Sequence, residues 1–483
     1  MQTKRQKKRP IIIKTCISQF FVVPLQENLK RMHSICAIST AYGVGGIAVI
    51  RVSGEGSIAI VDGLFRGRAS LADAKGGTVH YGRIERDGEV LDEVLCSVFR
   101  APHSFTGEET VEIACHGSLY IQQELLRWLI DAGCKAAEPG EFTRRAFLNG
   151  KMDLTQAEAV ADLIEAQSKA EKDLALSQLR GSVSTELAAL RERLLHFTSL
   201  VELELDFADH EELEFADRTE LQTLADEIEQ KLAALMHSFR TGNAIRNGIS
   251  VAIIGAPNVG KSTLLNALLG EQRAIVSDIQ GTTRDTIEDT LVIDGILFRL
   301  IDTAGIRETN DVIEQMGVER SRQAMEKAQI IISVQDATRP DEVIPATCPR
   351  LARDLSVLSV LNKVDLCSVS EQSERSVLCQ CSGQIPLSAK NGDIEPLRRE
   401  LVRVAKEMLP TSAVMLSNAR HYEAITRAHE AILRVKQGLQ DGLSGELLSM
   451  DLQDCLAALG EVTGQITNTE VLANIFSKFC IGK

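Results

Sequence analysis

A loop suited to surrounding phosphate groups is the strongest chemical signal in this sequence. Gly255–Ser262 has the sequence GAPNVGKS, which matches the pattern GxxxxGKS, and it lies between an apolar run and an expected helix over residues 263–269. Backbone amides in such a loop surround phosphate oxygens, while the ammonium of Lys261 neutralises phosphate charge and the hydroxyl of Ser262 binds Mg²⁺. The alternative is a glycine-rich structural turn. We therefore expect a nucleotide site that includes Asn258, Val259, Gly260, Lys261, Ser262 and Thr263.

Three further segments follow in the order that GTPases require. Asp302–Gly305 ends an expected strand and would place Asp302 near the metal and the Gly305 amide near the γ-phosphate. Asn362–Asp365 ends a second strand, and Ser388–Lys390 follows a third. A carboxylate at Asp365 accepts both N–H donors of guanine, whereas adenine presents it with an acceptor. The ordered set predicts that GTP contacts Asp302, Thr303, Ala304, Gly305, Asn362, Lys363, Asp365, Ser388, Ala389 and Lys390.

A switch loop is expected at Gly281–Asp285, where the hydroxyl of Thr283 would complete the Mg²⁺ shell while the γ-phosphate is present; a polar hairpin turn is the alternative. Ile306 follows the segment that ends at Gly305, at the position where Ras-type enzymes carry a water-orienting glutamine. Hydrolysis therefore needs other assistance. Acidic residues nearby are candidates, with ordinary helix-start charges as the alternative: Glu308, Asp311, Glu314 and Glu319.

Periodicity along the chain indicates the elements that must position these segments. Residues 248–408 alternate apolar strands with helices, and runs such as 249–254 and 330–334 are typical of a parallel sheet covered on both faces. Residues 32–150 predict an α+β domain, while 151–247 and 409–483 show helical spacing. We therefore predict a multidomain α/β and α+β fold in which a doubly wound P-loop domain is inserted into a discontinuous α-helical domain.

Bulk composition limits the possible partners. The 483 residues include 53 Lys and Arg against 67 Asp and Glu, a net charge of −14, so a nucleic acid would need a local basic surface. No apolar run has the ~18 residues of a membrane span, and the 11 scattered cysteines indicate reduced thiols in the cytoplasm.

Residues 1–31 are strongly basic. They predict an overextended or disordered start before Met32, with an organellar or secretory address as the alternative.

Four further segments carry a resemblance to a known family. They are Gly45–Gly54 (GGIAVIRVSG), Ser104–Glu108 (SFTGE), Pro139–Lys151 (PGEFTRRAFLNGK) and the ending Phe479–Lys483 (FCIGK). Together with the nucleotide motifs, they make the chain resemble the MnmE (TrmE) family of K⁺-dependent tRNA-modification GTPases from about Ala37 to its last residue. An α/β domain inserted between helical halves also fits that family.

The resemblance implies a reaction that the residues alone would not indicate. Members of the family act with an FAD-carrying flavoprotein, MnmG, in a heterotetramer and install a (carboxymethyl)aminomethyl group on the 5-position of the wobble uridine of certain tRNAs. A tetrahydrofolate held by the N-terminal domain supplies the one-carbon unit. The family's folate positions fall on Arg51, Glu112, Lys151 and Lys483, whose alternative role is in surface ion pairs. Cys480 would lie near the one-carbon site, with a small buried thiol as the alternative.

The resemblance also supplies the missing assistance to hydrolysis. A K⁺ ion beside the phosphates would be held by Asn258, Ser277, Ile279 and Thr282, and Glu314 would orient the attacking water when two G domains pair. The neighbouring loop residues Asp278, Gln280 and Gly281 join the expected GTP site. The family implies a homodimer formed through the N-terminal domain. Two departures are Ser118, where the family commonly has glycine, and Thr463–Glu470, which is less acidic than usual.

Two functions fit the sequence. The first is a GTPase that couples hydrolysis to wobble-uridine modification, with Lys261, Glu314 and Cys480 as its catalytic candidates. The second is an Era-like, GTP-dependent RNA-binding or ribosome-assembly switch, which would have no use for a folate site. Arg144 and Arg145 are candidate RNA contacts, although packed ion pairs are the simpler interpretation. The nitrogen donor of the modification, glycine or ammonium, stays open.

Overall fold

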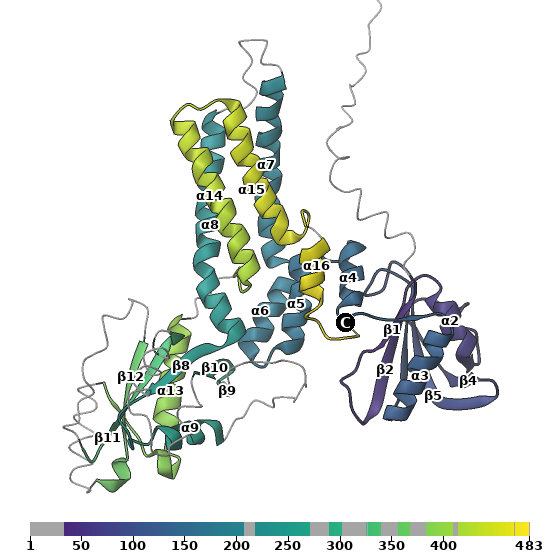
Figure 1. The fold of residues 1–483 in the computed structure, drawn as a ribbon, viewed down its shortest axis with the longest axis horizontal. Helices are drawn as coiled ribbons and strands as arrows, with labels where there is room; N and C mark the ends of the chain where they lie inside the picture. The colour runs from purple at the N-terminus through teal and green to yellow at the C-terminus, as the bar shows by residue number, and fades with distance from the viewer. Residues whose placement is uncertain are drawn as a thin grey trace, which may run out of the picture. The chain divides into compact units, whose positions relative to one another are not determined.

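The computed structural model describes residues 33–206, 218–270, 289–301, 325, 327–339, 356–367, 383–408, 414–467 and 469–482. The chain divides into two compact units, residues 1–152 with 468–483 and residues 153–467 (Figure 1). The final segment therefore belongs with the N-terminal unit, whereas the sequence pattern groups it with the second half of the helical domain. No helix in these described ranges combines the length and apolarity needed to cross a bilayer.

The N-terminal unit is built on a seven-stranded sheet with the strand order β3-β4-β5-β6-β2-β1-β7. All neighbouring strands are antiparallel except β1 and β7, which run parallel. Helices α2 (Ser57–Leu64) and α3 (Leu119–Asp131) pack on one face around a core that includes Ile50, Ile113 and Leu125. The strands are β1 (Ile35–Ile38), β2 (Gly45–Ser53), β3 (Phe65–Gly67), β4 (Thr78–Arg86), β5 (Glu89–Phe99), β6 (Thr110–Gly117) and β7 (Lys135–Ala136).

The C-terminal segment packs on this unit through close backbone approaches. Helix α16 (Thr469–Phe476) contacts α4 (Glu141–Leu148), and a Cβ at Gly140 would come within 2.8 Å of the carbonyl oxygen of Phe476. Gly482 has φ +95°, and a Cβ there would meet the carbonyl oxygen of Ile38 on β1 at 2.2 Å. The hydroxyl of Ser39 donates to the carbonyl oxygen of Gly482 at 3.2 Å. Glycine at position 482 therefore lets the chain ending lie directly against β1.

The helical part of the second unit joins segments from both sides of the inserted domain. Helices α7, α8, α14 and α15 share one apolar core that includes Leu194, Leu232, Ile432 and Leu452. Helix α5 begins with a capping box between Asp153 and Gln156, which satisfies amides of its first turn. The helices are α5 (Leu154–Glu165), α6 (Lys169–Leu179), α7 (Ser182–Asp206), α8 (Arg218–Asn247), α14 (Ala419–Gln440) and α15 (Gly445–Thr463).

The inserted α/β part has a six-stranded sheet with the order β13-β12-β11-β8-β10-β9, parallel except for β9. Both faces of its central strand β8 are covered, because Val251 and Ile253 belong to one core and Ala252 and Ile254 to another. The elements are β8 (Ile249–Ile254), α9 (Lys261–Gly270), β9 (Asp289–Ile293), β10 (Ile296–Leu300), β11 (Ile330–Asp336), β12 (Ser356–Asn362), β13 (Ile385–Pro386) and α13 (Glu395–Met408). The expected fold class is confirmed.

Candidate functional site

The P-loop connects the end of β8 to the start of α9 in a conformation that depends on its glycines. Gly260 has φ +97°, and a Cβ there would lie 2.3 Å from Nδ2 of Asn362. Asn258, at φ +63°, is a non-glycine residue in the left-handed region. The ammonium of Lys261 donates to the carbonyl oxygens of Gly255 and Ala256, each at 2.8 Å, and burial lowers the pKa of this lysine. The loop thus holds a lysine charge beside the first turn of α9.

Asn362 links this loop to the segment expected to bind guanine. Its Nδ2 donates to the carbonyl oxygen of Val259 at 2.9 Å, and its Oδ1 accepts from the backbone N–H of Ala389 at 3.0 Å. Only 3% of Asn362 is exposed, so both polar ends of the amide are satisfied within the protein. One buried side chain therefore sets the spacing between the P-loop and Ser388–Lys390.

The other side chains of the expected base site lie around this amide. Ser388 Oγ donates to Asp365 Oδ1 at 2.6 Å, which orients the carboxylate. Lys363, at φ +65°, extends its Nζ to the carbonyl oxygen of Asn258 at 2.6 Å. Ala389 and Lys390 form a short 3-10 helix, Ala389–Asn391. The structure therefore brings Asn258, Val259, Asn362, Lys363, Asp365, Ser388 and Ala389 into one hydrogen-bonded assembly, with Lys261, Ser262 and Thr263 on the adjoining turn of α9.

A second group of charged residues lies on the sheet of the N-terminal unit. Arg51 on β2 is directly opposite Glu112 on β6, and its Nε and Nη2 donate to Glu112 Oε1 at 3.0 and 2.8 Å. The guanidinium also lies 5.4 and 5.5 Å from the ring centroids of Phe105 and Phe142. No described residue donates to Glu112 Oε2. The pair thus presents a partly exposed acceptor beside a positioned cation.

Lys151 and Cys480 contact other parts of this unit. Lys151 Nζ donates to the carbonyl oxygen of Pro102 at 3.0 Å, and the N–H of Gly140 donates to the carbonyl oxygen of Cys480 at 3.4 Å. Within the described residues, neither forms a hydrogen bond or ion pair with Arg51 or Glu112. The Cys480 side chain is exposed, in contrast to the other six described cysteines, so the buried-thiol alternative for it is wrong.

Arg144 and Arg145 are engaged in ion pairs rather than free for RNA. Arg145 is buried and donates to Glu108, to Glu141 and to the carbonyl oxygen of His33. Arg144 Nη2 lies 3.0 Å from a Glu138 oxygen. The packed ion-pair interpretation is therefore confirmed for Arg145, whereas the pair between Arg144 and Glu138 lies at the surface.

Comparison with known proteins decides the family. A family model described as the MnmE helical domain matches residues 154–480, and one described as the GTP-binding protein TrmE N-terminus matches residues 34–151. The chain is 56% identical over 464 residues to the tRNA modification GTPase MnmE of Parabacteroides distasonis, covering 94% of this chain and 100% of that protein. The chain belongs to the MnmE family of tRNA modification GTPases. The chain is also 50% identical over 465 residues to the tRNA modification GTPase MnmE of Bacteroides thetaiotaomicron, and this match covers 93% of the chain and 99% of that protein.

Several residues that the nucleotide motifs or the MnmE resemblance predict for the sites lie outside the described residues. These are Ser277, Asp278, Ile279, Gln280, Gly281, Thr282 and Thr283 of the expected switch and K⁺ loop, Asp302, Thr303, Ala304 and Gly305, the glutamate Glu314, and the terminal Lys483. Their roles stay predictions. The described half of the nucleotide site comprises the P-loop and the guanine-specific segments.

One candidate residue escaped the motif analysis. Asp336 ends β11 and forms an ion pair with Lys363 at 2.6 Å. A polar residue at the carboxyl end of a parallel strand is the signal that could have indicated it, because such ends commonly form ligand sites. The nucleotide motifs assign no role to Asp336.

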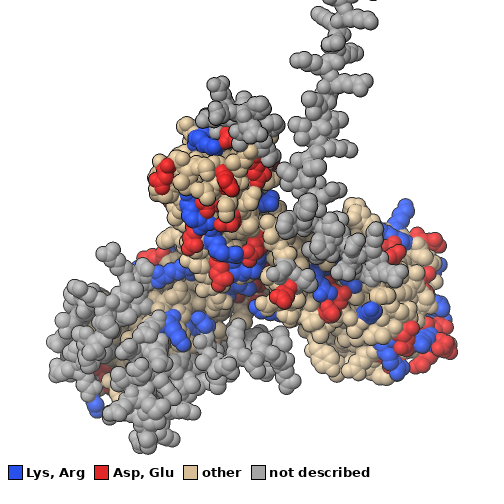
Figure 2. Space-filling view, turned by 45° about the horizontal axis from the view of Figure 1, so that its top comes forward, with Lys and Arg blue, Asp and Glu red and all other residues tan. Residues whose placement is uncertain are grey.

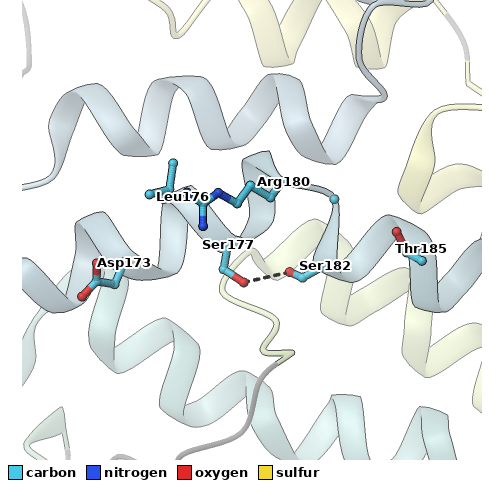
Figure 3. A pocket seen from close by; sticks show the side chains of 7 residues that line it. Asp173, Leu176, Ser177, Arg180, Ser182 and Thr185 are labelled. Carbon is cyan, nitrogen blue, oxygen red and sulfur yellow. Dashed lines mark hydrogen bonds between the residues drawn. The ribbon is translucent and has the colours of Figure 1, made fainter.

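One pocket in the described part of this MnmE-family chain is formed by helices of the second unit. It lies at the junction of α6 and α7 and has a volume of about 470 Å³. Figure 3 shows the side chains that line it, including Ser177 and Ser182, whose hydroxyls form a hydrogen bond of 3.1 Å. None of the residues lining it is among the expected site residues: Asp173, Leu176, Ser177, Arg180, Gly181, Ser182 and Thr185. Figure 2 shows basic and acidic side chains intermingled over the helices on the side in view.

Proposed function

We propose that the protein is a K⁺-dependent GTPase that acts in the cytoplasm with an MnmG-type flavoprotein to install a (carboxymethyl)aminomethyl group on the wobble uridine of certain tRNAs. The observation that carries the GTPase part is the Asn362 side chain, which joins the P-loop to the guanine segment. Membership of the MnmE family, whose relatives carry the name tRNA modification GTPase, supports the RNA substrate.

In the proposed complex, the phosphates of GTP lie over the amides of Gly255–Ser262 and the guanine faces Asp365. Lys261 exchanges its carbonyl partners for the phosphate oxygens, and the Asp365 carboxylate, oriented by Ser388, accepts the guanine N–H donors. Glu314 orients the attacking water. Mg²⁺ held by Ser262 and Thr283, and K⁺ held by Asn258, Ser277, Ile279 and Thr282, supply positive charge to the phosphates when bound.

The donors and acceptors of the N-terminal unit fit a tetrahydrofolate derivative. Glu112 Oε2 is available for pterin N–H donors, while Arg51 and Lys151 suit oxygen acceptors or carboxylates. Lys483 joins this set by the resemblance to the family's folate positions. Tetrahydrofolate supplies the one-carbon unit when bound. The exposed thiol of Cys480 is the candidate for chemistry at that group.

A homodimer through the N-terminal unit is supported by the sheet face opposite α2 and α3. Strand register places Tyr81, Leu95, Ala114 and Val49 side by side across β4, β5, β6 and β2. Tyr81 is 63% exposed and Leu95 is 46% exposed. An apolar row of this kind is a suitable surface for a second copy of the chain.

GTP turnover tests the hydrolytic part of the proposal. The full chain should hydrolyse GTP much faster with K⁺ than with Na⁺ as the only monovalent cation, and the activity per molecule should rise with protein concentration as G domains pair. Turnover that is indifferent to both variables would contradict the roles of Asn258 and Glu314.

Folate binding separates the two functional hypotheses. Calorimetric titration with a tetrahydrofolate derivative should detect binding, and Arg51→Met should weaken it by about tenfold or more through loss of a charged hydrogen-bond donor. Arg83→Met is the matched control, because Arg83 pairs with Glu85 on the same sheet. Absence of binding to the parent protein would favour the Era-like switch.

The tRNA substrate is tested in cells that lack this protein. Nucleoside analysis should detect unmodified wobble uridine, restored by the parent chain and not by Arg51→Met. Normal wobble uridine in the deletion strain would exclude a role in this modification.

A further inference from the structure

Asp336 lies beside the guanine-specific motif through strand pairing. It is the last residue of β11, and the register of the parallel pair aligns it with Asn362, the last residue of β12. The backbone N–H of Ala337 donates to the carbonyl oxygen of Asn362 at 2.8 Å, which extends the pairing past Asp336. The carboxylate is therefore next to Lys363, which follows Asn362 in the chain.

Both oxygens of the Asp336 carboxylate have defined partners. Oδ1 accepts from the backbone N–H of Thr338 at 2.9 Å and from its hydroxyl at 2.7 Å, while Oδ2 accepts from Lys363 Nζ at 2.6 Å. Burial opposes ionisation, but the hydrogen bonds from Lys363 and Thr338 outweigh it and lower the pKa of Asp336. The carboxylate is consequently a charged and oriented acceptor at neutral pH.

Lys363 is held at two points by this arrangement. Its Nζ donates to Asp336 Oδ2 and to the carbonyl oxygen of Asn258 in the P-loop, both at 2.6 Å. Its backbone has φ +65°, a conformation that costs a lysine energy and requires support from its surroundings. A free lysine side chain samples many rotamers. The ion pair with the buried carboxylate of Asp336 restricts the side chain of Lys363 to the rotamers that keep its ammonium at this position.

We propose that Asp336 is a positioning residue for guanine nucleotides, because it holds Lys363 between β11 and the P-loop and so couples the base site to the phosphate site. The proposal rests on the nucleotide placement proposed above. Asp336 acts through Lys363 and contacts no phosphate, so its loss should affect GDP and GTP alike. Turnover at saturating GTP should then change by less than about twofold.

The test is the dissociation rate of a fluorescent GDP from the full chain. Asp336→Asn keeps the side-chain size and an oxygen for Thr338 but removes the charge that holds Lys363. It should accelerate dissociation about tenfold, the equivalent of about 1.4 kcal/mol. Asp294→Asn is the matched control, because Asp294 pairs with Lys406 at 2.7 Å on an exposed turn of the same domain and should leave the rate unchanged.

A double-mutant cycle separates positioning from a purely structural role. Lys363→Met should also accelerate GDP dissociation, and adding Asp336→Asn to it should have no further effect. Additive effects of the two substitutions, or a lower melting temperature for Asp336→Asn with an unchanged dissociation rate, would overturn the positioning role. If Lys363→Met leaves the rate unchanged, the proposed nucleotide site itself is wrong. If Lys363→Met accelerates GDP dissociation but Asp336→Asn leaves the rate unchanged, the proposed nucleotide site is retained and the positioning role of Asp336 is wrong.

Discussion

The side-chain amide of Asn362 donates to the carbonyl oxygen of Val259 at 2.9 Å, across 103 positions of sequence. Val259 belongs to the P-loop that follows β8, whereas Asn362 ends β12, and β11 lies between these two strands in the sheet. The same amide accepts from Ala389, so three loops that begin at different strands share one buried group.

Replacing the side-chain amide of Asn362 should remove the hydrogen bonds that join the P-loop to the Ser388–Lys390 segment. Asn362→Ala leaves the carbonyl of Val259 and the N–H of Ala389 without their partner, and each buried orphan costs about 1–3 kcal/mol. We expect GTP affinity to fall by at least about tenfold, measured by equilibrium titration with a fluorescent nucleotide. Asn247→Ala, at an exposed position near the end of α8, should bind GTP as the parent does. Equal affinity in both variants would show that the bridge is dispensable.

The backbone of the P-loop should not tolerate a side chain at Gly260. Gly260→Ala combines φ +97° with a Cβ only 2.3 Å from Asn362 Nδ2. Strain and displacement of the amide together should cost about 3 kcal/mol, or roughly 100-fold in GTP affinity. Gly270→Ala, at the other end of α9, has nothing within 4 Å and serves as the control. A Gly260→Ala protein with parental affinity would contradict the loop geometry.

Guanine selectivity should depend on the carboxylate of Asp365. Asp365→Asn replaces an acceptor of two N–H donors with an amide that can donate, which suits the extra carbonyl of xanthine. GTP affinity should fall by roughly 100-fold while xanthosine triphosphate becomes the preferred ligand. Competition binding measures this exchange, with Asp393→Asn as the neighbouring control. Retained guanine preference would place the base elsewhere.

The helical domain should lose a specific contribution to stability in acid. Glu158 on α5 is buried and accepts from Arg420 and His421, 262 and 263 residues further along the chain. Burial opposes ionisation, but His421 and Arg420 lower the pKa of Glu158 from 4.5 to about 2. Because the folded pKa is depressed, the ion pair contributes about 3 kcal/mol above pH 4.5, and this is lost as pH falls from 4.5 toward 2.

Substitution at Glu158 isolates this contribution. Glu158→Gln should lower the unfolding midpoint of the helical transition at pH 7, and its difference from the parent should shrink as pH falls below 4.5. Far-UV circular dichroism during denaturant titration measures both effects. Glu423→Gln, on the exposed side of α14, should follow the parent at every pH. A Glu158→Gln difference that does not vary with pH would argue against the depressed pKa.

The chain ending should require glycine next to its last residue. Gly482→Ala places a Cβ 2.2 Å from the carbonyl oxygen of Ile38 and must displace the ending from β1. Since Lys483 is proposed to bind folate, affinity for a tetrahydrofolate derivative should fall by about tenfold in calorimetric titration. Gly63→Ala, in α2 with open space around it, is the control in the same unit. Unchanged folate affinity would remove Lys483 from the site.

Local pattern was sufficient for the nucleotide-binding strands and loops. The largely apolar run 249–254 coincides with β8, because a strand buried on both faces is apolar at nearly every position; the exception, Ser250, has its hydroxyl hydrogen-bonded within the protein. The expected run 330–334 forms most of β11, but the strand continues to Asp336. Its last residue went unnoticed because an aspartate before a turn is common, and only pairing with β12 brings it to Lys363.

Glycine spacing and apolar periodicity act over a few residues, so they were enough to predict the P-loop, the guanine-specific segments and the interruption of a helical domain. Tertiary structure alone decided which distant groups meet. Arg51 faces Glu112 because of the register between β2 and β6, and Glu158 meets Arg420 because helices from both sides of the inserted domain bury one core. Register and helix packing are set by the burial of whole faces against partners far along the chain, which no local window contains.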